Sequence, residues 1–394
     1  MSLGVRETEK VQDERQRKIC YVTTIDVTLQ AFFVSQLIFL KEKGFDVTVI
    51  CSPSERMNNL TDKGIRYIPV NITRGIDIIS LFQSIHELKK IFRNEKFDLV
   101  QYSTPNAGFC AAIASKCAKI PVRNYHLMGL RYLGAHGLLR KILKIIEKIS
   151  CACSTHIECV SQSNLKLSIE EKIFPPQKGV VIWNGSSGGI RLSRFDFHMR
   201  ETYRKEIRQK YQIGEKEFVF AFVGRITRDK GVNELLQAFK NVDNAKLMMV
   251  GNEENIQGID SQLFADSKAD ANIVYTGAVS EVEKYYAAAD ALVLPSYREG
   301  FGNVVIEAAA MGTPAIVTNI AGPIDTSIEN KTALWIPVKD SKALEDKMKM
   351  IMNDGEMLSE LQKNAVEFVR NSFDEDILNQ KIYERKLQLL KMEK

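Results

Sequence analysis

Apolar positions follow two alternating patterns from Lys18 onward. Short continuous apolar runs predict buried strands, and longer segments with apolar residues three or four apart predict helices. In the first half the predicted strands are KICYVTTI, FDVTVICS, IRYIPVNI, FDLVQYS and PVRNYHL. The predicted helices lie at about 29–43, ended by Gly44, and in IISLFQSIHELKKIFRNEK and NAGFCAAIASKCAK. This alternation is typical of a parallel sheet covered by helices on both faces.

The same alternation starts again near residue 217. The predicted strands are EFVFAFVGRI, KLMMVGN, NIVYTGAV, ALVLPSY, TPAIVTN and ALWIPV, and the helices between them include GVNELLQAFKNV, EVEKYYAAAD and NVVIEAAAMG. A basic connector, Arg191–Lys210, marks the boundary. We therefore predict an α/β protein of two facing, doubly wound, Rossmann-like domains, residues 18–195 and 196–375. Ligands of such domains bind at the carboxyl ends of the strands, which here means the cleft between the domains.

The two ends of the chain differ from this pattern. Residues 1–17 are polar and charged and lack the apolar segment of a signal peptide, so they predict a disordered leader. The final segment, about 376–394, is helical and strongly charged. It is either a solvated terminal helix or one that packs back across the first domain. No run of about 18 apolar residues predicts a membrane span.

Composition narrows the class of protein only a little. A chain of 394 residues suggests two domains, and its formal net charge of +5 would favour an anionic partner without naming one. All seven cysteines lie in the first 160 residues, and none has paired CxxC zinc spacing. We therefore expect reduced thiols in a cytoplasmic protein and no structural metal site.

The stretch REGFGNVVIE, which follows a predicted strand and opens a helix, carries the clearest chemistry. Gly300 and Gly302 let the backbone approach a ligand closely, and free N–H groups at a helix start suit a diphosphate. Those groups belong to Phe301, Gly302, Asn303, Val304 and Val305. Glu299 could accept hydrogen bonds from sugar hydroxyls. Glu307, four residues past Asn303 and on the same helix face, could accept a pair of ribose hydroxyls. The structural alternative is a helix start where acids are favoured by the dipole.

A second stretch, VGRITRDKG, also joins a strand to a helix. Gly224 permits a tight turn, and Arg225 and Lys230 could converge on a phosphate group beside the helix that starts near Gly231. A solvated loop with incidental charges is the alternative. The fingerprints GxGxxG and GxxxxGK[ST] are absent, which disfavours nicotinamide or flavin enzymes and P-loop NTPases.

Together EGFGNVVIE, VGRITRDKG and YTGAVSEVEKYYAAADALVLPS resemble the donor domain of the retaining glycosyltransferases of family four, which have the GT-B architecture. The resemblance extends over nearly the whole chain from Lys18 and is strongest in the second half. It implies that Glu299 contacts the transferred sugar and Glu307 the ribose, while Arg225 and Lys230 bind the diphosphate. It also implies that Gly277, Ala278 and Val279 read the base, usually uracil, through their backbone.

The first half resembles bacterial members that build capsule, O-antigen or lipid-linked oligosaccharides. The stretches that carry this likeness are VTTIDVTLQAFF, TPNAG, YHLMGLRY and WNGSSGGIRLSRF. Many relatives have a histidine immediately before the glycine that matches Gly129, where this chain has Met128. His126 lies two residues earlier, on the same strand face. It is either a catalytic residue on the acceptor side or a satisfied core histidine.

The segment His136–Ser150 has a broad apolar face flanked by Arg140, Lys141, Lys144 and Lys148. It is either a domain-packing helix or an interfacial helix on an anionic membrane. Phe32 and Phe33 either belong to such a face or pack in the core.

The resemblance implies a retaining hexosyl or N-acetylhexosaminyl transferase that moves a sugar from a UDP-sugar to a hydroxyl acceptor. The expected acceptor is a polyprenyl-diphosphate-linked sugar or another glycan. We expect no metal cofactor, no nucleic-acid partner, and a cytoplasmic location with peripheral contact on the inner face of the membrane. Two alternatives stay open: a GT-B nucleotide-sugar 2-epimerase, and a non-catalytic nucleotide-sugar-binding subunit.

Overall fold

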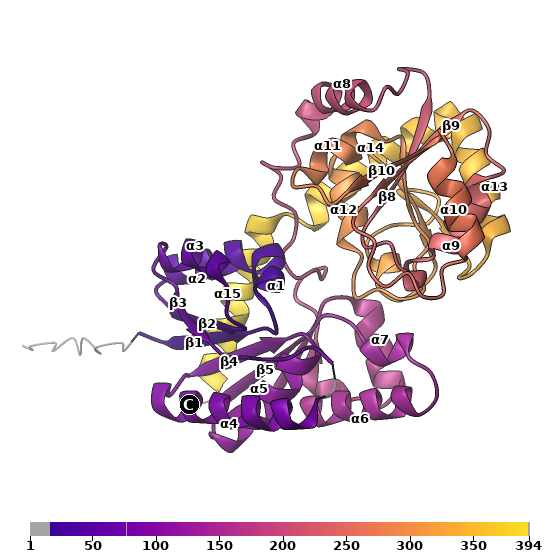
Figure 1. Ribbon diagram of the computed structural model, residues 1–394. Coiled ribbons are helices and arrows are strands. Elements are labelled where there is room, and N and C mark those ends of the chain that lie inside the picture. The colour runs from indigo at the N-terminus through magenta and orange to yellow at the C-terminus, as the bar shows by residue number, and fades with distance from the viewer. Residues whose placement is uncertain (1–15, 76, 393–394) are drawn as a thin grey trace, which may run out of the picture.

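Two parallel sheets organise the chain in the computed structural model, which describes residues 16–75 and 77–392 (Figure 1). The first sheet is built from residues 18–180 and the second from residues 218–336. Most of the predicted leader, residues 1–15, lies outside the described residues. The chain therefore forms the two α/β domains that its apolar pattern predicts.

The first sheet has seven strands in the order β3-β2-β1-β4-β5-β6-β7, and every neighbouring pair is parallel. The strands are β1 (Lys18–Val22), β2 (Asp46–Cys51), β3 (Arg66–Pro69), β4 (Leu99–Ser103), β5 (Val122–Leu127), β6 (His156–Cys159) and β7 (Gly179–Val180). One face is covered by α4 (Ile78–Glu95), α5 (Pro105–Cys117) and α6 (Gly137–Cys153), which lie together in Figure 1. The other face is covered by α1 (Asp26–Phe32), α2 (Val34–Glu42), α3 (Asn58–Thr61) and α15 (Glu375–Met392). A further helix, α7 (Gln162–Glu170), follows β6.

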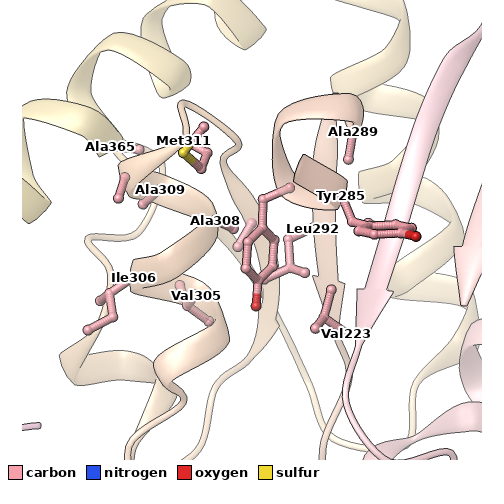
Figure 2. Close-up of a cluster of buried hydrophobic side chains, with 14 of the residues drawn as sticks. Val223, Tyr285, Ala289, Leu292, Val305, Ile306, Ala308, Ala309, Met311 and Ala365 are labelled. Carbon is pink, nitrogen blue, oxygen red and sulfur yellow. The ribbon is translucent and has the colours of Figure 1, made fainter. Parts of the chain in front are cut away.

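The second sheet has six parallel strands in the order β10-β9-β8-β11-β12-β13. They are β8 (Phe218–Val223), β9 (Ala245–Val250), β10 (Ile273–Gly277), β11 (Ala291–Leu294), β12 (Ala315–Thr318) and β13 (Ala333–Ile336). The helices are α8 (Arg200–Lys210), α9 (Val232–Phe239), α10 (Ser261–Ala269), α11 (Val282–Ala288), α12 (Asn303–Ala310), α13 (Ser341–Asn353) and α14 (Gly355–Ser372). Figure 2 shows the core that α11, α12 and α14 form with this sheet, and this core fixes the start of α12 beside the end of β11.

The C-terminal helix α15 leaves the second domain and completes the first. Its Leu389 and Leu390 are buried in the core that surrounds β1 and β2. Lys386 is fully buried, and its ammonium donates hydrogen bonds to both carboxylate oxygens of Glu158, at 2.9 and 3.0 Å, and to Gln101 Oε1 at 2.6 Å. Burial alone would raise the pKa of Glu158, but the neighbouring Lys386 charge, together with the smaller effects of His126 and of hydrogen bonds to the carboxylate, holds the pKa below its usual value.

Two details differ from the sequence prediction. The helix predicted at 29–43 is two helices, because the chain breaks at Phe33, whose fully buried ring contacts Tyr21 and His126. This burial also removes Phe33 from the predicted membrane face. Strands β6 and β7 were not predicted, since one has polar His156 and Glu158 in its four residues and the other has only two residues.

Part of the predicted connector belongs to the second domain. Helix α8 packs against α11, and both Arg204 and Arg208 pair with Asp290 at 2.8 Å. No helix in the described part of the chain is long and apolar enough to cross a membrane.

Candidate active site

The carboxyl ends of the two sheets face each other, and the loop between β11 and α12 touches the first domain. Gly300 lies against the backbone of Met128 and Gly129, which follow β5. Its carbonyl accepts hydrogen bonds from Asn164 Nδ2 at 2.5 Å and from Ser161 Oγ at 3.1 Å. The predicted sugar-binding loop therefore lies at the interface of the two domains.

Glu299 and Lys230 form an ion pair in this loop region. Lys230 Nζ is 2.5 Å from Glu299 Oε1, and Ser296 Oγ donates a 2.8 Å hydrogen bond to the same oxygen. Both charged side chains are mostly buried, at 18% and 13% exposure. The pair fixes the carboxylate beside the start of α12, where it could accept hydrogen bonds from a bound sugar.

Arg225 occupies a different position from Lys230. Its side chain is 53% exposed and makes only a long contact, 3.4 Å, with Glu254. It lines a cleft of about 700 Å³ that also contains Asp229 and Arg298 of the second domain and His136 of the first. Unlike Lys230, Arg225 is therefore available to a ligand without breaking a buried ion pair.

The start of α12 is built as a tight, glycine-dependent turn. Gly302 has φ +100°, and Phe301 is buried against Phe373 with ring centroids 5.5 Å apart. One predicted feature is wrong: the Val305 N–H is not free, because it donates a 2.9 Å hydrogen bond to the Gly302 carbonyl. Since a first-turn bond of this kind tightens the helix start, the candidate anion-binding amides are those before Val305.

Glu307 lies one turn into α12 and lines a cavity of about 180 Å³. Asn303 and Arg194 line the same cavity, as do residues 30–36 of the first domain. Tyr286 donates a 2.7 Å hydrogen bond to Glu307 Oε2. Burial raises the pKa of the Glu307 carboxyl, and the Tyr286 hydrogen bond offsets only part of that effect.

The predicted base-reading edge already has some of its backbone groups paired. The Gly277 carbonyl accepts a hydrogen bond from Gly251 N–H at 2.9 Å, and Ala278 N–H donates to Asn252 Oδ1 at 3.0 Å. Gly277 has φ +69° and no atom within 4 Å of where a Cβ would be, so the edge is open on that side. Of the three predicted residues, Val279 has no such backbone bond among the contacts found within the described residues.

The turn at Gly224 is held by a close backbone contact. Gly224 has φ +147°, and its N–H bonds to the Val250 carbonyl at 2.9 Å. A Cβ at Gly251 would lie 1.9 Å from the Gly224 carbonyl oxygen. The chain segments that follow β8 and β9 therefore approach each other through the backbones of Gly224 and Gly251, just before Arg225.

His126 lies in the first domain, at the end of β5, and is 7% exposed. Its Nε2 is 3.1 Å from Ser187 Oγ, and its Nδ1 is buried with no hydrogen-bond partner among the residues that the structure describes. Burial lowers its pKa to about 4, so the ring is neutral near pH 7. The structure gives His126 the surroundings of a core residue, with one ring nitrogen unused.

Sequence reasoning missed the residues that connect the two domains. Ser163 donates to Asp325 through both its N–H, at 3.0 Å, and its hydroxyl, and it accepts from Gly322 N–H at 2.8 Å. Ser161 caps α7, a role that a serine before a helix can suggest. Its second contact, with Gly300, depends on a residue 139 positions away and has no local sequence signal.

The facing sheets and the glycine-rich helix start between them define a GT-B glycosyltransferase architecture. Residues 18–161 match the family model "Glycosyl transferase 4-like", and residues 203–368 match "Glycosyl transferases group 1". HepE of Anabaena, solved in complex with UDP, superposes with a TM-score of 0.74 at 16% identity, covering 94% of this chain and 100% of that one.

Curated relatives show the same likeness over nearly the full length. The capsular polysaccharide biosynthesis glycosyltransferase CapM of Staphylococcus aureus is 30% identical, over 92% of this chain and 95% of CapM. A Campylobacter jejuni N,N'-diacetylbacillosaminyl-diphospho-undecaprenol alpha-1,3-N-acetylgalactosaminyltransferase is 27% identical, over 88% of this chain and 93% of that enzyme. The chain belongs to the family 4-like glycosyltransferases.

Proposed function

We propose that this glycosyltransferase moves a sugar from UDP to a hydroxyl of a lipid-linked glycan, with retention of anomeric configuration. The observation that carries the proposal is the Glu299–Lys230 pair, fixed at 2.5 Å beside the start of α12 and at the contact with the first domain. A carboxylate there can accept hydrogen bonds from the transferred sugar. Lys230, the other member of the pair, would contact the leaving diphosphate.

The donor would extend from Glu299 to Glu307 along the start of α12. The amides before Val305 would face the diphosphate, and Arg225 would reach it from the cleft side. Glu307, held by Tyr286, would accept the ribose hydroxyls. The choice of UDP draws support from HepE, which was solved with UDP, and the activity of the Campylobacter relative suggests an N-acetylated sugar.

In the proposed reaction the bond between the anomeric carbon and the diphosphate oxygen breaks, and a bond forms to the acceptor oxygen on the same face of the sugar. The acceptor proton passes to the departing phosphate. Arg225, Lys230 and the α12 amides stabilise the negative charge on UDP, because fixed donors lower the barrier where charge develops. His126 is neutral near pH 7, so it would add no positive charge to this stabilisation.

We propose that this stabilisation works without a divalent ion. The chain has an Asp-x-Asp pattern at 374–376, but Asp374 caps α15 by accepting from Asp376 N–H at 2.9 Å and from Ile377 N–H at 3.1 Å. Transfer should therefore continue in excess EDTA.

The acceptor proposal rests on the relatives. CapM acts in capsular polysaccharide biosynthesis, and the Campylobacter enzyme acts on a sugar linked to undecaprenyl diphosphate. By analogy we propose a polyprenyl-diphosphate-linked acceptor in surface-polysaccharide synthesis, used at the inner face of the cell membrane.

The test is release of UDP from UDP-sugars with and without an undecaprenyl-diphosphate-linked sugar. Release that requires the acceptor supports transfer. Isomerisation of the sugar without acceptor would instead show a 2-epimerase, and UDP binding without turnover of any donor would show a binding subunit. Glu299→Ala should abolish transfer while UDP still protects the protein against thermal unfolding. Glu360→Ala, at an exposed position of α14, is the matched control and should behave as wild type.

A further inference from the structure

Helix α6 has apolar side chains on the face that points away from the protein. Leu143 and Cys151 face the core, whereas five large apolar residues on the helix are exposed. These are Leu138, Leu139, Ile142, Ile145 and Ile149. Leu138 is 73% exposed, and the spacing of 138, 142, 145 and 149 places these residues in one stripe along the helix. Packing of α6 within the domain does not account for this stripe, because the stripe faces water. Contiguous exposed apolar surface usually marks an interaction site.

A second group of exposed apolar residues lies at the start of α4. Ile78 and Ile79 belong to its first turn and Phe82 to its second, and Phe82 is 70% exposed. The chain before α4 is fastened to the first turn of α5, because Asn106 Nδ2 donates to the carbonyls of Thr73 at 2.7 Å and Gly75 at 2.6 Å. The start of α4 therefore lies beside the start of α5.

The three helices α4, α5 and α6 form one face. Helix α5 contacts both of the others and carries Phe109 and Ile113, which are half-buried. Each helix follows a strand of the same parallel sheet, so all three begin at its carboxyl edge, which is the cleft side. Figure 1 shows them together on one side of the first domain. We call the outer surface of α4, α5 and α6 the three-helix face.

The charge on α6 complements an anionic surface. Its four cations are Arg140, Lys141, Lys144 and Lys148, and its one acid, Glu147, is buried. Arg140 and Lys144 contact Glu171, whereas Lys141 and Lys148 are exposed along one edge of the apolar stripe. The outward side of α6 thus combines apolar residues with lysines and presents no carboxylate of its own.

We propose that the three-helix face docks on an anionic lipid bilayer. The apolar residues would enter the boundary between head groups and acyl chains, and Lys141 and Lys148 would contact the anionic head groups. His136, which lines the large cleft, immediately precedes α6, so docking would hold the cleft next to the membrane. This orientation rests on the proposed lipid-linked acceptor, whereas the docking itself needs neither donor nor acceptor.

The test is co-sedimentation of the full-length protein with phosphatidylcholine vesicles, with and without phosphatidylglycerol, in the absence of substrates. Wild type should bind the anionic vesicles more tightly. Phe82→Ser/Leu138→Ser should weaken that binding roughly ten-fold or more, because it removes exposed apolar area that would be buried in lipid. Ile256→Ser/Met350→Ser removes exposed apolar residues of the second domain and should bind as wild type.

A second variant tests the charge without touching the apolar residues. Lys141→Gln/Lys148→Gln should lose the preference for phosphatidylglycerol and should unfold at the wild-type temperature, since both lysines are exposed. The proposal is overturned if wild type shows no preference for anionic vesicles, or if Phe82→Ser/Leu138→Ser binds as tightly as wild type. It is also overturned if wild type sediments as a dimer that this variant dissociates, because the face then binds a second copy. Absence of transferase activity alongside normal vesicle binding would refute the proposed function and leave the docking intact.

Discussion

Substitution of Gly300 by alanine should disturb the contact between the two domains without destabilising either domain. A Cβ built at Gly300 would lie 1.7 Å from the Met128 carbonyl oxygen, whereas real Cβ atoms essentially never approach another heavy atom closer than 3.0 Å. Gly300 does not have the positive φ that would require glycine, so the obstruction arises between the domains and not within the loop. The added methyl should therefore force the two domains apart at this point.

The required separation is roughly 1.3 Å, and a misplacement of about 1 Å can lower catalysis about 10²-fold. We expect Gly300→Ala to lower kcat by that order. The melting temperature and UDP binding should stay close to wild type, because Lys230 and the start of α12 both belong to the second domain. The assay is initial-rate transfer with saturating donor and acceptor, together with thermal unfolding with and without UDP.

Gly355→Ala is the matched control, since a Cβ there meets no atom within 4 Å and alanine favours the helix it would join. A kcat for Gly300→Ala within about threefold of wild type would refute the argument that this contact is needed for catalysis. A large loss of melting temperature would show that the contact supports folding instead.

Three further outcomes follow from the ion pairs and the buried acid. Arg225→Ala should weaken UDP roughly 10- to 100-fold in a binding titration, whereas Lys230→Ala should also lower kcat, because it leaves Glu299 without its partner. UDP-sugar affinity should fall as the pH drops through the raised pKa of Glu307, since only the carboxylate accepts two hydroxyls, and Glu307→Gln should bind weakly at every pH. Lys386→Met should lower the free energy of unfolding by about 3–5 kcal/mol in urea titrations, and adding Glu158→Gln should restore much of it.

The two domains could be predicted from the sequence because their strands are continuous apolar runs. Such runs indicate strands of a sheet that is covered by helices on both faces. It could not predict the break at Phe33 or the short strand β6, because each depends on partners far away in the chain. Phe33 turns inward to contact His126, and β6 carries Glu158, whose partner Lys386 lies 228 residues later. The local pattern of apolar residues predicts a helix or strand only where that helix or strand does not depend on a residue far away in the chain.

The arrangement of the second-domain part of the candidate site was predictable for a related reason. Glu299, Gly302 and Glu307 lie within one strand–loop–helix unit, so their spacing in the sequence reflects their spacing in the structure. The ion pair between Lys230 and Glu299 joins two such units and was not predicted. The contacts of Ser161, Ser163 and Asn164 with the second domain require both domains to be in place.

The buried Lys386 also determines when the first domain can complete its folding during synthesis. Domains of a growing chain generally fold in the order in which they are made. Here Gln101 and Glu158 are made early, yet the ammonium that donates hydrogen bonds to both and neutralises Glu158 lies 285 and 228 residues later. Until α15 has been synthesised, Glu158 lacks its partner and the sheet face that α15 covers stays open to water. The half of the enzyme that is synthesised first is therefore the half that is completed last.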